Sequence, residues 1–562
     1  MKRVFIGSTA ILSGLAGVAA AQETPFELPP IILESGFRDA RDIRDAHVAG
    51  SVVQGEELER RQADTFEELI GDIPGVTIEG GPRGISQEPN IRGFQDEQVV
   101  LRVDGGRLNF NQAHRGRFFF DPDIVQRVEV VRGGGSTLFG SGVIGGVISV
   151  ETKDPADLLK AGRTTGARFR FGGASNGNLT SGTATVFGDW GAFDVLAFVG
   201  SRSMGSPLED GDGNDILRSE IDADNLLLKF GFEPTADQRF ELSLSYYEDE
   251  GITPPNANDE ARLIGTPSNP ANPVERSAEI FTTRLSWDYN PEGSDALDLS
   301  VLFYGNLLDI SEDRISDGRR DDTEYDTYGF EIVNRSRFDM GIPVSLVYGF
   351  EAYRDTQTGT RDGADRIQFP DAEADTLGVF AEATFGVTET LDIIAGARFD
   401  SYERDVDDPS LADADDTFFS PRVGFSYRPN DNWQFFGNLA QAYRAPTLTE
   451  LYNDGEHFVV DLNPGLRGVN NFVPTPDLRE EESIQVELGT RFETSGFARP
   501  GDRLSFAANA YYAEVDNFID TVVTNFVFPP GPPPAPVCGA TYKRALEAEL
   551  RGNEDGEGFD EG

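Results

Sequence analysis

The chain alternates apolar and polar residues over long runs from about residue 166 onward. In the clearest run, Phe281, Leu285 and Tyr289 share one face, while Thr282 and Arg284 lie on the other. A period of two is that of a β-strand with one apolar side. The runs extend over about 9 to 13 residues, whereas strands in globular proteins average about 5 or 6. This greater length is the one that a tilted strand needs to cross a bilayer.

Short and long connectors alternate between these runs. The short ones, rich in Gly, Pro, Asn and Asp, are 189–192, 234–238, 290–296, 341–344, 386–390 and 429–431, and the long acidic ones are 205–223, 249–279, 309–324, 355–374, 404–417 and 444–481. Outer-membrane barrels have tight periplasmic turns and long outer loops in this order. The pattern predicts an all-β transmembrane barrel over residues 166–527, with about 15 strands, in preference to a soluble periplasmic sandwich.

Residues 46–155 mix helical and short strand signals instead. Thr65 is followed three residues later by Glu68, a pattern typical of a helix start, and Pro74-Gly75 ends that segment. The sequence therefore predicts a small α+β domain ahead of the barrel.

The alternation stops after residue 527. Residues 528–562 form a Pro-rich and acidic tail without a final amphipathic strand. A sheet edge cannot lie open in lipid, because its N–H and C=O groups would lack partners. We therefore expect the barrel to be incomplete in this chain, through truncation or a frameshift.

Residues 1–21 are typical of a cleaved secretory signal. Lys2 and Arg3 precede an apolar and small-residue stretch, and the A-x-A site at 19–21 lies just before Gln22. No later stretch approaches the ~18 apolar residues of a membrane-spanning helix, so a closed barrel is the predicted way across a bilayer.

The charge balance narrows the choice of partners. The chain has 562 residues, with 48 Lys and Arg against 97 Asp and Glu, for a net charge of −49. Nucleic acid is excluded as a partner, because phosphate binding depends on clusters of cations. The single Cys excludes a disulfide framework and Cys-rich metal sites. No catalytic nucleophile, acid–base pair or metal triad emerges, so we do not expect an enzyme.

A series of short motifs in the α+β domain carries a family resemblance. The motifs are Asp-Ile-Pro-Gly-Val at 72–76, Ile-Arg-Gly-Phe at 91–94, Val-Asp-Gly at 103–105, Val-Glu-Val-Val-Arg-Gly at 128–133 and the Gly-rich segment 138–148. In this order and spacing they resemble the plug domain of TonB-dependent outer-membrane receptors. The resemblance implies a plug inside a barrel of about 22 strands, in the outer membrane of a Gram-negative bacterium and in contact with its lipid.

The segment 22–45 between the signal and the plug contains a second motif of this family. Leu28, Pro29, Pro30, Ile31, Ile32 and Leu33 resemble the TonB box. An extended, Pro-stiffened apolar segment is suited to adding a strand to a partner sheet. The resemblance implies the TonB–ExbB–ExbD energy-coupling complex as a partner.

Two of the three histidines occupy positions that resemble those of haem receptors in the family. His114 lies seven residues before Asp121-Pro122, and His457 lies between two boxes. The first box is Tyr443, Arg444, Ala445 and Pro446, and the second contains Pro476, Asp477 and Leu478. Imidazole is a common axial ligand of haem iron. The resemblance implies that His114 and His457 are the two axial ligands, with haem as cargo and no prosthetic group.

Four neighbouring residues complete the predicted pocket. Tyr452 and Phe458 are candidates to line the porphyrin, and Arg115 and Arg117 are candidates to pair its propionates or to face acidic wall residues instead. We expect uptake of haem, free or from a haemoglobin-type protein. A receptor for a ferric siderophore or cobalamin is the alternative, and a non-transporting surface protein is a third possibility.

Overall fold

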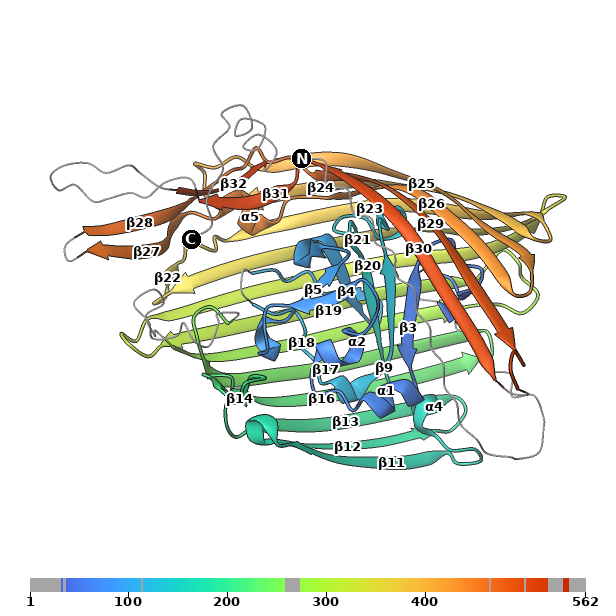
Figure 1. Ribbon diagram of the computed structural model, residues 1–562, viewed down its shortest axis with the longest axis horizontal. Coiled ribbons are helices and arrows are strands. Elements are labelled where there is room, and N and C mark those ends of the chain that lie inside the picture. Colours follow the sequence, from blue (N-terminus) through green and yellow to red (C-terminus); the bar gives the residue numbers. More distant parts are fainter. Residues whose placement is uncertain are drawn as a thin grey trace.

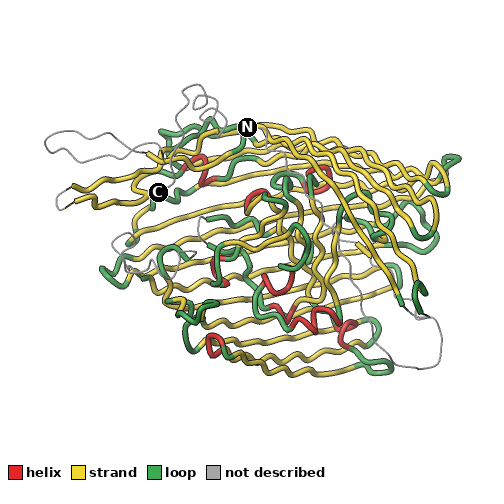
Figure 2. The backbone as a smooth tube through the Cα atoms, viewed as in Figure 1, coloured by secondary structure: helices red, strands yellow, loops and turns green. Residues whose placement is uncertain are grey.

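The computed structural model describes residues 32–33, 37–112, 115–257, 273–463, 466–499, 502–523 and 539–544. A large curved sheet forms a wall, and a smaller α+β domain lies against its concave side (Figure 1). Strands make up most of the chain, and the helices are short (Figure 2). Within the described ranges, no helix combines the length and apolar character needed to cross a membrane. The signal segment 1–21 lies outside these ranges.

The wall is a 16-stranded antiparallel sheet in which fifteen strands follow one another in sequence order, as many as predicted. These are β11 (Thr165–Ala174), β12 (Leu179–Asp189), β13 (Phe193–Met204), β16 (Asp222–Thr235), β17 (Gln238–Thr253), β18 (Val274–Tyr289), β19 (Leu299–Arg314), β20 (Arg320–Asp339), β21 (Pro343–Arg361), β23 (Ala372–Thr388), β24 (Leu391–Val406), β25 (Ala414–Asn430), β26 (Trp433–Arg444), β29 (Glu481–Ser495) and β30 (Arg503–Asp516). The short β22 (Ala364–Asp365) pairs with β21, and β11 and β30 are the two ends of the order.

The two faces of the wall differ as the alternation predicts. On β18, Phe281 and Leu285 are exposed on the outer face, whereas Arg284 is buried on the inner face. On β19, Phe303 is likewise exposed and Tyr304 is buried. An apolar outer face and a polar inner face are the arrangement of a membrane barrel with a filled lumen.

The strands reach further than the sequence indicates. The sequence predicts a long connector over the acidic segment 309–324, but β19 continues to Arg314 and β20 begins at Arg320. Asp309 lies directly opposite Glu324 in this ladder. Beyond the apolar band both faces of a ribbon meet water, so polar side chains do not interrupt it, and acidity alone is a poor sign of a loop.

The plug is built on two small sheets. One has the order β3-β9-β10-β7-β8, and the other has the order β4-β5-β6. Their bounds are β3 (Gly50–Gln54), β4 (Val76–Glu79), β5 (Glu88–Ile91), β6 (Phe94–Gln95), β7 (Val99–Val103), β8 (Gly106–Arg107), β9 (Val125–Arg132) and β10 (Gly146–Thr152), with helices α1 (Glu56–Arg61), α2 (Phe66–Ile70), α3 (Ser136–Phe139) and α4 (Pro155–Leu158). Thr65 caps α2 as predicted, because its side chain accepts a hydrogen bond from the backbone N–H of Glu68 at 3.4 Å.

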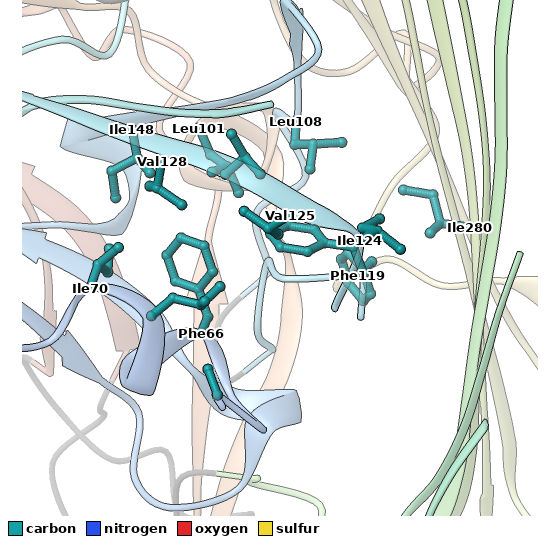
Figure 3. Close-up of a cluster of buried hydrophobic side chains, with 14 of the residues drawn as sticks. Phe66, Ile70, Leu101, Leu108, Phe119, Ile124, Val125, Val128, Ile148 and Ile280 are labelled. Atoms are coloured by element: carbon teal, nitrogen blue, oxygen red, sulfur yellow. The ribbon is translucent and has the colours of Figure 1, made fainter. Parts of the chain in front are cut away.

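One apolar cluster joins the plug to the wall (Figure 3). It contains Phe66 and Ile70 of α2, Val128 of β9 and Phe119 from the plug, together with Ile280 of the wall. Charged side chains cross the same seam: the Arg92 guanidinium lies 2.6 Å from the Glu487 carboxylate on β29. The plug is therefore fixed to the inner face by both apolar packing and buried ion pairs.

The remaining strands lie at the two ends of the wall. β1 (Ile32–Leu33) pairs with β2 (Arg41–Asp42) ahead of the plug. At the end of the wall with the longer connectors lie β14 (Leu208–Glu209), β15 (Asp215–Ile216), β27 (Gly455–Asn463) and β28 (Leu466–Val473), and β31 (Ile519–Val523) and β32 (Gly539–Arg544) extend the sheet of β27 and β28. The hairpin of β27 and β28 projects beyond that end (Figure 1).

Candidate functional site

His457 lies on β27, in the projecting hairpin. The pairing of β27 with β28 shifts register between Glu456 and Phe458, so that His457 occupies a bulge. Its Nδ1 lies 3.0 Å from the amide oxygen of Asn470, and its ring stacks on Phe472 with centroids 4.1 Å apart. Bulges of this kind turn a side chain out of the regular ladder and are frequent next to functional sites.

The surroundings of His457 keep its imidazole neutral. Burial lowers its pKa below the ordinary 6.5, against an opposing contribution from Asn470. The contact between Nδ1 and the Asn470 side chain fixes the orientation of the ring. A neutral imidazole whose orientation is set by a hydrogen bond at the other ring nitrogen has the form that binds a metal ion.

His114 lies outside the described residues, but Arg115, the next residue in the chain, is described. Arg115 is buried and its guanidinium lies 2.6 Å from the carboxylate of Glu312, two residues before the end of β19. The same guanidinium donates to the carbonyl of Pro255 at 3.0 Å. The loop therefore reaches the end of the wall that also carries the hairpin of His457.

Arg115 and Arg117 do not act alike. Arg115 faces the wall carboxylate, which was one of its two predicted roles. Arg117 stays within the plug, where it pairs with Asp96 at 3.0 Å and donates to the carbonyls of Val99 and Leu108. In this conformation its two terminal nitrogens are therefore occupied by the protein.

The segment 362–371 connects the two halves of the site. Arg366 is buried and donates to the hydroxyl of Thr323 on the wall at 2.7 Å. One residue further on, the carbonyl of Ile367 accepts from the backbone N–H of Asp454 at 3.0 Å, just before the hairpin begins.

The two sequence boxes lie below the hairpin, around helix α5 (Leu448–Tyr452). Tyr443 and Arg444 end β26, and the backbone N–H of Thr475 donates to the carbonyl of Leu451 at 2.8 Å. Leu478 packs against the same helix. Ala445, Pro446, Pro476 and Asp477 complete these two segments. The boxes therefore support α5 rather than surround His457.

Tyr452 and Phe458 are the two predicted porphyrin-lining residues. Tyr452 is fully buried in the α5 cluster and its hydroxyl donates to the carbonyl of Arg404 at 2.8 Å. It therefore acts as a support for the helix and not as a lining of an open site. The side chain of Phe458 lies outside the described residues.

A polar cavity of about 90 Å³ lies between the plug and the wall below α5. Arg107, Arg117, Arg404 and Arg444 line it together with Glu97 and other residues. A cavity of about 910 Å³ lies at the opposite end, beside the turns 389–390 and 429–432. Within the described ranges, no group of three or more His, Cys, Asp or Glu side chains could hold a metal ion.

The carboxyl group of Glu97 should make the stability of the protein depend on pH. Burial, together with Asp96 and Glu450, raises its pKa to about 8 from the ordinary 4.5. The folded state then holds a proton that the unfolded state releases above its own pKa, so the free energy of unfolding should fall as pH rises from about 4.5 to about 8.

Glu97→Gln should remove this dependence. We expect the variant to melt at a higher temperature than the wild type at pH 8.5 and at the same temperature at pH 4.5, as measured by circular dichroism in detergent. Glu56→Gln, at an exposed plug carboxylate, is the control and should change neither value. If the melting temperature of Glu97→Gln changes between pH 4.5 and pH 8.5 as much as that of the wild type, the raised pKa of Glu97 is not the cause of the pH dependence.

Comparison with known proteins identifies the family. Residues 42–147 match the model for the TonB-dependent receptor plug domain, and residues 210–559, more than half of the chain, match the model for the TonB-dependent receptor-like β-barrel. The chain belongs to the TonB-dependent receptors. The predicted class of a β-barrel with a plug is thereby confirmed, as are the outer membrane as its location and transport, not catalysis, as its kind of activity.

The most informative relatives of this TonB-dependent receptor are named for haem. The hemin receptor of Yersinia pestis is 30% identical over 483 residues, which cover 85% of this chain and 69% of that protein. The heme/hemopexin utilization protein C of Haemophilus influenzae is 29% identical over 506 residues, covering 83% and 68%. Among solved structures, the Serratia marcescens hemophore receptor HasR, in complex with its hemophore HasA and heme, has a TM-score of 0.76 at 22% identity, covering 89% and 77%. This last likeness concerns the fold.

Sequence reasoning missed the residues that orient His457 and the boxes. Asn470 and Phe472 lie 13 and 15 positions after the histidine, and only the hairpin brings them to its ring. Glu450 and Glu481, the partners of Arg444, fall in the segment 444–481, which the sequence predicts as a long connector. The one available signal was Thr447 followed three residues later by Glu450, which is a helix capping box.

Proposed function

We propose that this TonB-dependent receptor binds haem at the outer surface and passes it to the periplasm. The observation that carries the proposal is His457, a half-buried, neutral imidazole held by Asn470 and Phe472 on the projecting hairpin. The names of the relatives from Yersinia and Haemophilus support the same cargo. His114 is the second axial ligand, on the plug loop beside Arg115.

The position of Arg115 supports a role in this site. Its pairing with Glu312 holds a guanidinium at the top of the plug loop, one residue after His114. A haem propionate could exchange with Glu312 for this guanidinium, because both are carboxylates. Uptake is driven by contact of residues 28–33 with TonB, which works with ExbB and ExbD, while the outer face of the wall contacts lipid.

A haem titration of the purified receptor in detergent tests the proposal. We expect the wild type to give a saturable Soret shift with a six-coordinate, low-spin spectrum. His114→Ala and His457→Ala should each lose the six-coordinate spectrum, because each removes one axial ligand. The absorption spectrum across the Soret and visible bands is recorded as haem is added.

His47→Gln is the matched control. His47 is fully buried beside Phe37 and away from the hairpin, so its loss should leave the haem spectrum unchanged. A folded wild type without a saturable Soret shift would overturn the proposal and favour a ferric siderophore or cobalamin as cargo.

A further inference from the structure

The segment 443–446 is attached to the plug through its backbone. The carbonyl of Tyr443 accepts from the N–H of Gly142 at 3.0 Å, and its own N–H donates to the hydroxyl of Ser136 at 3.1 Å. The N–H of Ala445 donates to the hydroxyl of Ser141 at 2.9 Å. Three bonds therefore join this wall segment to helix α3 of the plug and to the turn after it.

Arg444 connects the same point to two carboxylates. Its Nε donates to Glu481 at 2.9 Å, and its two terminal nitrogens each donate to Glu450 at 2.8 Å. All three side chains are buried. A bidentate guanidinium–carboxylate pair fixes orientation as well as distance, so Arg444 holds Glu450 in one place.

The plug shares this network through Gln98. The side-chain amide of Gln98 donates to both oxygens of Glu481 at 3.2 Å. Glu481 therefore accepts from the plug and from Arg444 at the same time. A displacement of the plug would therefore either break the bonds to Glu481 or move Glu481 and Arg444 together with the plug.

Helix α5 continues the connection to the hairpin. Glu450 is the third residue of the helix and accepts from the backbone N–H of Thr447 at 2.7 Å, which closes its capping box. The backbone N–H of Asn453 donates to the carbonyl of Thr449 at the end of the helix. The N–H of Asp454 donates to the carbonyl of Ile367 just before β27 begins. Only two residues separate Asp454 from His457.

We propose that Arg444 is a positioning residue that couples the plug to the hairpin carrying His457. When the plug is docked, Arg444 holds α5 through Glu450, and α5 holds the base of the hairpin. When the plug moves, the bonds from Gln98, Ser136 and Ser141 are lost, α5 loses its anchor, and the histidine withdraws from its ligand. This inference rests on the proposed function for the identity of that ligand.

Spin-label distances test the coupling without haem. Labels at two exposed positions, Glu456→Cys and Asp362→Cys, in a Cys538→Ser background, report the hairpin against the wall. We expect one narrow distance distribution in the wild type and a broad one after Arg444→Met. Arg444→Lys, which keeps the charge but not the bidentate pair, should give an intermediate width.

Arg422→Met is the matched control, because Arg422 is equally buried and paired with a wall carboxylate, Glu382, but makes no bond to α5. It should leave the distribution narrow. Should Arg444→Met fail to fold, Gln98→Leu cuts the network from the plug side alone and should broaden the distribution too. A narrow distribution in Gln98→Leu and in any folded Arg444 variant would overturn the inference.

Haem dissociation separates this inference from the proposed function. Arg444→Met should release haem about tenfold faster than the wild type, with a shift from a six-coordinate to a five-coordinate spectrum, since supports of a metal ligand are worth about 10- to 100-fold in affinity. A six-coordinate wild type together with an unchanged Arg444→Met would refute the coupling and leave haem binding intact. A wild type that binds no haem would refute the proposed function, and the spin-label result would still decide the coupling.

Discussion

Arg398→Met should lower the free energy of unfolding by about 3 to 5 kcal/mol, because it leaves buried carboxylates without their main counter-charge. Arg398 is fully buried on β24, where it pairs with Glu351 at 2.9 Å and with Asp400 at 2.7 Å. It also donates to the carbonyl of Leu138 in the plug at 3.2 Å. The variant therefore weakens the wall and the docking of the plug together. Urea titration in detergent, followed by tryptophan fluorescence, measures the change.

Arg354→Met is the matched control for this experiment. Arg354 pairs with Glu373 and Asp375 on the outer side of the wall, but it is half exposed. Exposed ion pairs contribute less than about 1 kcal/mol, so the control should lie close to the wild type. Equal destabilisation by both variants would show that the buried cluster has no special role.

Replacement of residues 28–32 by a Gly/Ser stretch should abolish uptake of haem iron and leave haem binding unchanged. In the proposed function, haem binds at the outer end of the molecule, whereas the energy for transport enters through the proposed TonB box. Of the box, only Ile32 and Leu33 fall within the described residues, where they pair with Arg41 and Asp42. Growth on haem as sole iron source, with Soret titration of the same variant, measures the two effects separately.

Leu33 is kept in this variant for a structural reason. Its side chain is fully buried against Phe37, Val48 and Val131, so its loss would disturb plug packing as well as any contact with TonB. The control replaces residues 22–27, a stretch of similar length before the box, and should support normal growth. Growth of the box variant at the wild-type rate would exclude residues 28–32 as the coupling element.

The sequence was sufficient to predict the elements but not the partners of the charged residues. Alternation through Phe281 and Leu285 predicted a lipid-facing strand, because that pattern depends only on which side of a strand a residue occupies. The pairing of Arg444 with Glu450 and Glu481 depends on how β26, α5 and β29 meet, which a linear pattern does not encode. The same holds for Asn470 at His457.

The acidic segments show a second limit. The sequence predicts a long connector at Asp309 and Glu324, yet these residues face each other across a ladder. Their polarity indicates that the side chains are in contact with water. It does not indicate whether the backbone is hydrogen-bonded to a neighbouring strand. Strand length beyond the membrane is therefore decided by cross-strand pairing, which no single window of sequence contains.

The reach of these ribbons sets the height at which cargo first meets the receptor. The 20 residues of β20 span about 66 Å along the strand, or about 50 Å of height at a tilt near 40°, whereas the apolar band of such barrels is about 25 Å tall. Roughly half of the strand thus stands clear of the bilayer as a stiff rim. Because this rim carries acidic side chains such as Asp309, Asp322 and Glu324, the electrostatic potential at the entrance is negative.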